Sequence, residues 1–181
     1  MCVVKMQLLL ITNGSSITAE RKRKVRYYFK GNFGQIINLE KDFRGYIDVK
    51  LVVISESHGL VRGGEMIGSE SGEKNYQPDK ISSKLSNMIS NYQLGFISLP
   101  KWIFLDIFKP SEEKDLTKRF SPDSIWGLFV SQTVLDLLNY KMIKEKNIVL
   151  ITEPRKGVAR YTNTIKKEFL RKIRETIDLR N

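Results

Sequence analysis

The residues with the clearest chemical potential follow an apolar run near the middle of the chain. His58 is the only histidine of the sequence, and it lies between Glu56 and Arg62 directly after Val49–Ser55. A histidine in such a place can act as a general acid or base, or donate a hydrogen bond to a phosphate or nucleobase. Glu56 or Glu65 could orient it, so His58 and Glu56 are the candidate catalytic residues. The alternative is a histidine that only packs against or caps a turn.

Two other turns carry groups suited to phosphate. The apolar run Met6–Thr12 ends in Asn-Gly-Ser-Ser, whose small residues let an anion approach the backbone at the start of a helix. The run Asn147–Thr152 is followed by Arg and Lys side chains and by Tyr161, which can stack on a base. Over the three turns, the candidate nucleotide- or phosphate-binding residues are Asn13, Ser15, Ser16, Arg62, Arg155, Lys156 and Arg160. The first turn has neither P-loop nor dinucleotide-binding spacing, and an ordinary turn capped by serine is its alternative interpretation.

Positive charge is concentrated in two segments. The chain of 181 residues has 31 Lys and Arg against 20 Asp and Glu, and residues 21–30 and 155–180 together hold 15 of the basic and 3 of the acidic ones. Joined in one face, the two segments would attract a polyanion, most simply a nucleic-acid backbone. The candidate backbone contacts are Arg21, Arg23, Lys24, Arg26, Lys166, Lys167, Arg171 and Arg174. The alternative is that these are only the solvated faces of amphipathic helices.

Several classes of protein are excluded by what the sequence lacks. Cys2 is the only cysteine, which excludes an internal disulfide framework and, with a single histidine, the usual zinc sites. No carboxylate spacing suggests a metal site, so we expect neither metal nor cofactor. The longest apolar runs fall far short of the roughly 18–20 residues that span a bilayer, and no signal-peptide cleavage site follows the first of them. We therefore expect a cytoplasmic protein, in an oligomeric state that the sequence leaves open.

Apolar runs alternate with amphipathic stretches, which predicts an α/β fold of three layers with a mostly parallel central sheet of four to five strands. The expected strands are Met6–Thr12, Val49–Ser55, Trp102–Phe108 and Asn147–Thr152, with Leu94–Leu99 competing for the third place. The expected helices span residues 17–30, 35–43, 80–93, 121–140 and 162–179. The length predicts one domain over residues 1–181.

Residues 56–79 are rich in glycine and predict a long loop. Within it, the Gly63-Gly64 pair could hinge a mobile segment at about residues 62–79 over the site, as a lid does. Ligands of open α/β sheets bind beyond the carboxyl ends of the strands. If the strands are parallel, the three polar turns therefore share one rim of the sheet.

The stretch Lys50–Gly68 (KLVVISESHGLVRGGEMIG) resembles a segment of YaaA-like proteins of the peroxide-stress type and their small α/β relatives. In those proteins a strand ends in Ser-Ala-Lys-(His/Tyr)-Gly-Leu, followed by an acidic and an apolar residue. The matching positions here are Ser55 to Leu60, then Glu65 and Ile67. The aromatic segment Tyr27–Phe33 is similar in place and type, so the resemblance covers about residues 6–68.

This resemblance implies an α/β core with a basic cleft that binds nucleic acid, and kinship to base-processing enzymes. Two departures bear on activity. Ser57 stands where the relatives usually have lysine, and Asn13, Ser15 and Ser16 occupy a turn that often holds a cysteine and a lysine in the relatives. A lysine-dependent activity is therefore not carried over with the fold.

Three functions remain open from the sequence. The first is a nucleic-acid-binding protein, with DNA or RNA as its partner and a nucleotide or base pocket at the rim of the sheet. The second is a hydrolase of nucleic acid or nucleotides, of the nuclease or N-glycosidase type, with His58 as acid/base and Arg62, Arg155 and Lys156 stabilising negative charge. The third is a basic module that docks on an acidic protein.

Overall fold

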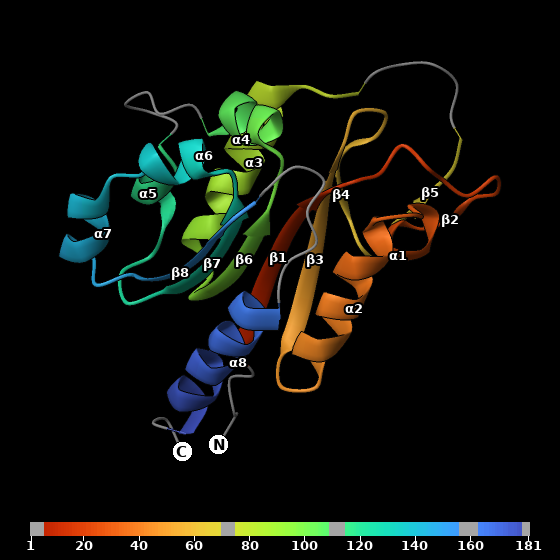
Figure 1. Cartoon of the computed structure of the whole chain (residues 1–181). Coiled ribbons are helices and arrows are strands. Elements are labelled where there is room, and N and C mark those ends of the chain that lie inside the picture. Colours follow the sequence, from red (N-terminus) through yellow and green to blue (C-terminus); the bar gives the residue numbers. More distant parts are fainter. Residues whose placement is uncertain (1–5, 70–74, 109–114, 156–162, 179–181) are drawn as a thin grey trace.

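A six-stranded sheet forms the centre of the molecule (Figure 1). The structure is a computed structural model, and it describes residues 6–69, 75–108, 115–155 and 163–178. The strand order is β4-β3-β1-β6-β7-β8, and β4 alone runs antiparallel to its neighbour. The strands are β1 (Gln7–Asn13), β3 (Asp48–Ser55), β4 (Gly59–Arg62), β6 (Leu94–Ser98), β7 (Ile125–Val130) and β8 (Val149–Pro154). A separate ribbon pairs β2 (Arg23–Lys24) with β5 (Met66–Ile67). The α/β class and the mostly parallel sheet are confirmed, whereas four to five strands was too few.

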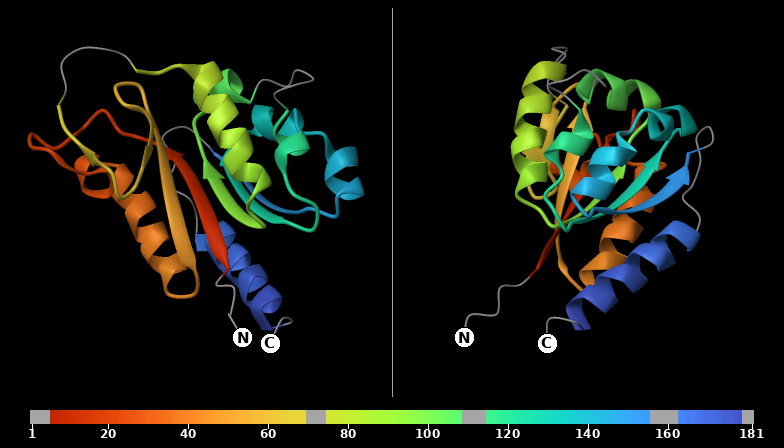
Figure 2. Two further views of the ribbon diagram at one scale, coloured as in Figure 1. Left: turned by 180° about the vertical axis from the view of Figure 1, so that it is seen from behind. Right: turned by 90° about the vertical axis from the view of Figure 1, so that its left-hand side faces the viewer.

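The helices pack against both faces of this sheet (Figure 2). They are α1 (Val25–Tyr28), α2 (Phe33–Arg44), α3 (Pro78–Ser90), α4 (Lys101–Ile107), α5 (Leu116–Arg119), α6 (Gln132–Asp136), α7 (Tyr140–Glu145) and α8 (Asn163–Asp178). Alternation along β1 sends Leu8 and Leu10 to a core shared with α1, α2 and α8, and Leu9 and Ile11 to a core shared with α3 to α7. Because both faces are covered, β1, β3, β6 and β7 are buried over most of their length and consist largely of apolar residues, whereas the edge strand β8 is buried only at Ile151.

The expected helix over residues 17–30 is wrong. The chain leaves the sheet after β1, turns back through β2 and forms only the short α1, and Thr18 bridges Phe29. Backbone bonds from Ala19 N to Tyr28 O and from Lys30 N to Ile17 O, both 2.8 Å, close this excursion. Only Val25, Tyr28 and Phe29 provide a buried apolar set at its second half, too short for a long amphipathic helix.

The apolar stretches around the two tryptophans each have the opposite secondary structure to the predicted one: the expected strand is a helix, and part of the expected helix is a strand. Trp102–Phe108 lies almost entirely in helix α4, and the competing run Leu94–Leu99 contains the strand β6. Residues 121–140 do not form one helix, because Ile125–Val130 is a strand whose six residues are all buried between β6 and β8. In a short continuous apolar run, the spacing of the residues does not distinguish a buried strand from a buried helix. Neighbouring residues then indicate which of the two forms, as Pro100 does directly before helix α4.

The expected loop over residues 56–79 is wrong in part. Strand β4 forms a hairpin with β3, and β5 is paired with β2, so residues 59–62 and 66–67 are held in ladders. Helix α3 begins at Pro78. Of the predicted lid, residues 70–74 lie outside the described residues.

The topology fixes where a site can form. Among the parallel strands, taken in chain order, the spatial order is 2-1-3-4-5, the pattern of a doubly wound sheet. In the sheet, β3 lies on one side of β1, and β6, which comes later in the chain, lies on the other side of β1. The direction of winding therefore switches between β1 and β6. The carboxyl ends of the parallel strands lie at the upper edge of the sheet in Figure 1. That rim, at the switch point, is where such folds bind ligands.

Candidate functional site: two adjoining cavities at the rim of the sheet

Two cavities open at the carboxyl ends of the strands, and both are lined by Asn13, Gly14, Ser15 and Ser16. The first, here called the switch-point cavity, has a volume of about 280 Å³ and lies over β1 and β6. The second, the hairpin cavity, has about 470 Å³ and lies beside the β3–β4 turn. Small-molecule sites commonly have volumes of about 300–1,000 Å³, so the hairpin cavity lies within that range and the switch-point cavity just below it.

The floor of the switch-point cavity is a row of side chains on neighbouring strands. Thr12 of β1 pairs with Ser98 of β6, which in turn pairs with Phe129 of β7. Alternation places all three on the face that α2 covers, and Gln35 of α2 forms part of the wall. Arg155, directly after β8, completes the lining. Asn13 and Arg155 are therefore brought to one cavity, as the sequence predicted.

The hairpin cavity combines aromatic and polar groups. Tyr76 and Trp102 meet edge to face with ring centroids 5.8 Å apart, and Trp102 is 47% exposed. The Tyr76 hydroxyl donates a 3.2 Å hydrogen bond to Asp106 Oδ2. Burial raises the pKa of Tyr76 above its ordinary value, and Asp106 and Glu56 raise it further, so this hydroxyl stays protonated at neutral pH. The exposed Glu56 gives the cavity an acidic edge.

His58 lines the hairpin cavity, but its ring is used within the chain. Nε2 lies 2.8 Å from the carbonyl oxygen of Gly68, so Nε2 carries the proton and donates it. Nδ1 lies 3.4 Å from Ser55 Oγ, and the ring packs edge-on against Tyr28. In the part of the chain that the structure describes, Glu56 makes no hydrogen bond to His58. In this geometry, His58 fastens the β3–β4 hairpin to the segment after β5, and its catalytic role stays a prediction.

The first turn is also partly occupied by its own bonds. Ser15 Oγ lies 2.7 Å from the carbonyl oxygens of both Ile17 and Lys30, so it closes the excursion after β1. Gly14 has no positive φ; a Cβ there would lie 2.6 Å from Cε1 of Phe29, so close packing requires this glycine. Ser16 is exposed and makes no hydrogen bond to a described residue, which leaves it available to a ligand.

The other predicted phosphate-binding residues are not all at the rim. Because β4 is antiparallel, Arg62 at its end pairs with Val52 and lines a separate cavity toward the amino end of β3, with Arg26 and Arg44. Lys156 and Arg160 lie outside the described residues. The structure thus unites His58, Asn13, Ser15, Ser16 and Arg155 around two adjoining spaces and leaves Arg62 apart.

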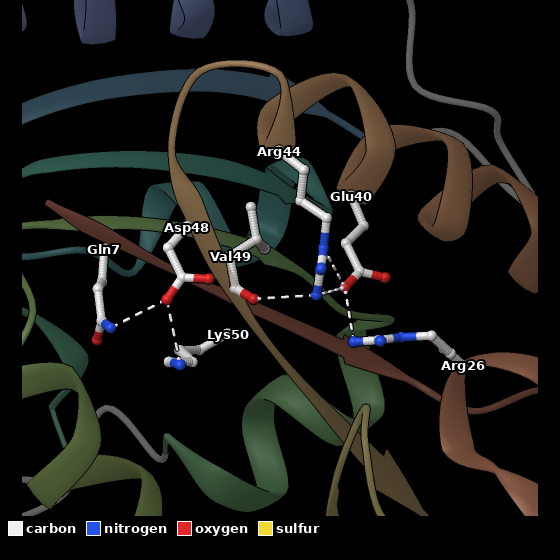
Figure 3. Close-up of polar contacts among 7 residues, drawn as sticks. All are labelled: Gln7, Arg26, Glu40, Arg44, Asp48, Val49 and Lys50. Atoms are coloured by element: carbon white, nitrogen blue, oxygen red, sulfur yellow. Dashed lines mark hydrogen bonds and ion pairs between the residues drawn. The ribbon is translucent and has the colours of Figure 1, made fainter. Parts of the chain in front are cut away.

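The predicted basic face is divided. Arg26 and Arg44 both bind Oε1 of Glu40, a carboxylate 3% exposed, with Arg26 Nη2 at 3.1 Å and Arg44 Nη2 at 2.7 Å (Figure 3). Arg44 also reaches the carbonyl of Val49, while Asp48 binds Gln7 and Lys50. Arg26 is therefore an internal structural residue, withdrawn from a polyanion by its buried counter-charge.

The cations of α8 dock this helix or pair along it. Lys166 binds Asp42 of α2 at 2.7 Å, and Arg171 pairs with Glu175. Arg174 lies over the ring of Tyr46, 4.3 Å from its centroid, and donates to its hydroxyl. Figure 1 shows α2 between α8 and the β2–α1 segment, so the cations of α8 do not adjoin those of residues 21–26.

Exposed cations without an ion pair to a described residue remain in the first segment. They are Arg21, Lys22, Arg23, Lys24 and Lys30, with Lys167 on α8 in the same state. We call residues 21–24 the basic turn. Lys22 packs beside Gly68, the residue whose carbonyl holds His58, so the basic turn flanks the hairpin cavity.

Sequence reasoning missed Thr12, Ser98, Tyr76 and Trp102. Ser98 is the last residue of β6, which lies within the run Leu94–Leu99. If that run is chosen as the third strand, Ser98 is predicted to lie at the rim of the sheet. Trp102 lies in an apolar run that predicts a buried strand, and its place on α4 leaves it half exposed instead. Nothing local marks Thr12 or Tyr76, whose position depends on strand pairing and on the path before α3.

Neither metal nor membrane features appear in the described ranges. No group of three or more His, Cys, Asp or Glu side chains there is placed to hold a metal ion. None of the helices in those ranges is both long enough and apolar enough to pass through a bilayer.

Comparisons with protein-family models, with curated proteins and with solved structures found no match to this chain.

Proposed function

We propose that this protein binds nucleic acid at the rim of its sheet, with the basic turn on the phosphate backbone and an unpaired base in the hairpin cavity. The observation that carries this proposal is the adjacency of exposed, unpaired cations and a cavity with an exposed tryptophan. The resemblance of residues 6–68 to YaaA-like proteins favours the same class of ligand.

The electrostatic part of the proposal rests on the basic turn. Arg21, Lys22, Arg23 and Lys24 are exposed, and no described acid neutralises them. Four consecutive cations, bordered by the carboxylates of Glu20 and Glu65, leave a positive excess that attracts a polyanion, and each neutralised phosphate releases counterions. The cations of α8 contribute less, because Lys166 and Arg171 already have carboxylate partners.

The base-binding part rests on Trp102 and Tyr76. An exposed aromatic ring offers a sequence-tolerant surface for stacking, worth about 1–3 kcal/mol per base. The hairpin cavity beside it is about 470 Å³, and the carboxylate of Glu56 at its edge can accept a hydrogen bond from an exocyclic amino group. A flat exposed ring and a polar recess together suit an unstacked base better than a continuous duplex.

The salt dependence of binding tests the electrostatic part. We expect the triple variant Arg21→Gln, Arg23→Gln, Lys24→Gln to bind labelled single-stranded DNA or RNA more weakly, with a log Kd against log salt slope smaller by about 2, since each contact on a single strand contributes about 0.7. The matched control removes the same charge from α3 and α7 with Lys80→Gln, Lys84→Gln and Lys144→Gln, and should keep the parent slope. Equal slopes for both triple variants, or no binding at low salt, would refute the proposal.

Substitution of Trp102 tests the base-binding part. Trp102→Ala should weaken binding about 5- to 150-fold, the loss of one stacked base, while Trp102→Phe should retain most of it. Trp126 is fully buried, so quenching of tryptophan fluorescence by the ligand reports on Trp102. Unchanged affinity and unchanged fluorescence would remove Trp102 from the site.

A further inference from the structure

The switch-point cavity contains two hydroxyls that the described part of the chain does not use. Thr12 and Ser98 are 1% and 4% exposed, and neither hydroxyl is bonded to a described residue. They are register partners on β1 and β6, so the two hydroxyls stand side by side on the cavity floor. Both residues line the cavity, so their hydroxyls can bond to a molecule that enters it. Two neighbouring hydroxyls on the floor of one cavity point to a polar ligand that bonds to both.

The charge of the lining indicates which ligand that is. Arg155 is the only charged residue that lines this cavity among the described residues, and Asn13 and Ser16 add polar groups at its mouth. Hydroxyl donors combined with one guanidinium suit a compact oxyanion such as phosphate. The backbone N–H groups of Phe33, Gly34 and Gln35 at the start of α2 bond to carbonyls of residues 30–32, so side chains would have to make these contacts.

The charged residues that line the two cavities have opposite signs. The acidic group of the hairpin cavity is Glu56, whereas the switch-point cavity is lined by Arg155, and residues 13–16 separate them. A nucleotide has the same division, with an anionic phosphate at one end and a base rich in donors at the other. One nucleotide can therefore lie across Asn13–Ser16 with its base beside Trp102.

We propose that the switch-point cavity binds a terminal phosphate monoester, that of a mononucleotide or of a nucleic-acid end, through the hydroxyls of Thr12 and Ser98 and the guanidinium of Arg155. The assignment of the phosphate to a nucleic-acid end rests on the proposed function, whereas the phosphate site itself does not.

The test compares phosphorylated with unphosphorylated probes. The probes are inorganic phosphate, nucleoside 3′- and 5′-monophosphates with their nucleosides, and single-stranded oligonucleotides with or without a terminal phosphate. We expect the parent protein to prefer each phosphorylated probe. In the variant Thr12→Val, Ser98→Ala that preference should fall about 10- to 100-fold per hydroxyl that binds, the effect of one hydrogen bond to a charged group.

Unfolding measurements exclude a merely structural effect. Because the two hydroxyls have no partner in the described chain, Thr12→Val with Ser98→Ala should leave the midpoint of urea unfolding unchanged or raise it. Ser55→Ala is the matched control, a buried serine on the hairpin cavity whose hydroxyl contacts His58; it should keep the preference for phosphate. Arg155→Gln, at the edge of the cavity, should lower that preference in a chain whose urea unfolding shows that it folds.

The outcomes separate this inference from the proposed function. If oligonucleotides bind equally well with and without a terminal phosphate, the nucleic-acid end is not the ligand of this cavity, while the proposed nucleic-acid binding stands. Mononucleotide binding that depends on phosphate and on both hydroxyls supports the cavity even if oligonucleotides do not bind. Equal affinity for every phosphorylated and unphosphorylated pair, or a double variant with the parent's preference, overturns the phosphate site.

Discussion

At the scale of single residues, the type of a side chain determined what it can do, and its neighbours determined what it does. His58 has the chemistry of an acid/base group, but its Nε2 proton is donated to the carbonyl of Gly68. Ser98 and Trp102 were unremarkable in the sequence, yet one brings a hydroxyl and the other an exposed ring to the rim. The polar side chains of a site are thus sorted by hydrogen-bond partners that lie far away in the chain.

Tyr76 gives a residue-scale prediction about pH. Its folded-state pKa is raised, first by burial and then by Asp106, so the stability it contributes is fully present below the ordinary tyrosine pKa of about 10 and is lost as the pH rises above it. We expect the unfolding free energy to fall less steeply between about pH 9.5 and 11.5 in Tyr76→Phe than in the parent. Urea unfolding across this range measures it, with Tyr27→Phe, an exposed tyrosine, as control. Parallel curves for Tyr76→Phe and the parent would contradict the assignment.

At the scale of elements, β6 and β7 fit together through two glycines, each opposite a large ring. Gly95 pairs with Trp126, and Phe96 pairs with Gly127. A Cβ on Gly95 would lie 2.0 Å from Cζ3 of Trp126, and one on Gly127 would lie 2.3 Å from Cδ2 of Phe96. The absent side chains make room for rings on opposite faces of the sheet. This pairing explains why an apolar stretch with glycines in it is a strand, although glycine weakens strands in general.

Gly95→Ala should therefore destabilise the protein by at least about 1–3 kcal/mol, because Trp126 is fully buried and cannot yield. Gly34→Ala is the matched change inside helix α2, where a Cβ meets nothing within 4 Å. It should stabilise the protein by about 0.5–1 kcal/mol, since alanine loses less backbone entropy than glycine on folding. Urea unfolding of the two variants measures both effects, and a Gly95→Ala protein as stable as the parent would show that the strands can shift apart.

At the scale of the whole molecule, α8 joins parts of the fold that lie far apart in the chain. Phe169 is fully buried, with ring centroids 5.4 Å from both Phe43 of α2 and Phe96 of β6. Together with the pair between Lys166 and Asp42, these contacts bind the last helix to the first half of the chain (Figure 1). A basic helix that the sequence offered as a nucleic-acid contact is therefore first a part of the core.

Phe169→Ala should lower the free energy of unfolding by about 3–5 kcal/mol, because it leaves a cavity beside the rings of Phe43 and Phe96. Lys167→Ala, on the exposed side of the same helix, should change it by no more than about 0.5 kcal/mol. Thermal and urea unfolding followed by circular dichroism provide both values. A small effect of Phe169→Ala would mean that α8 is docked by its ion pairs and not by its apolar stripe.

The sequence by itself determined the elements whose pattern is local. The runs that became β1 and β3 were recognised because strands buried on both faces are mostly apolar, and the edge strand β8 because it begins with four apolar or β-branched residues. The helices α2, α3 and α8 were recognised because one stripe of each is apolar. It also placed Asn13, His58 and Arg155 just beyond strand ends. These predictions needed no partner strand.

Only the tertiary structure decided the rest. Whether Ile125–Val130 is strand or helix depends on the gap between β6 and β8 that it fills, and the adjacency of Thr12 and Ser98 depends on a register between strands about eighty residues apart. Whether a cation is free, as in the basic turn, or paired, as Arg26 is with Glu40, depends on which acid the fold brings to it. Pairing across the sheet and across helices is non-local, so a pattern read along the chain does not contain it.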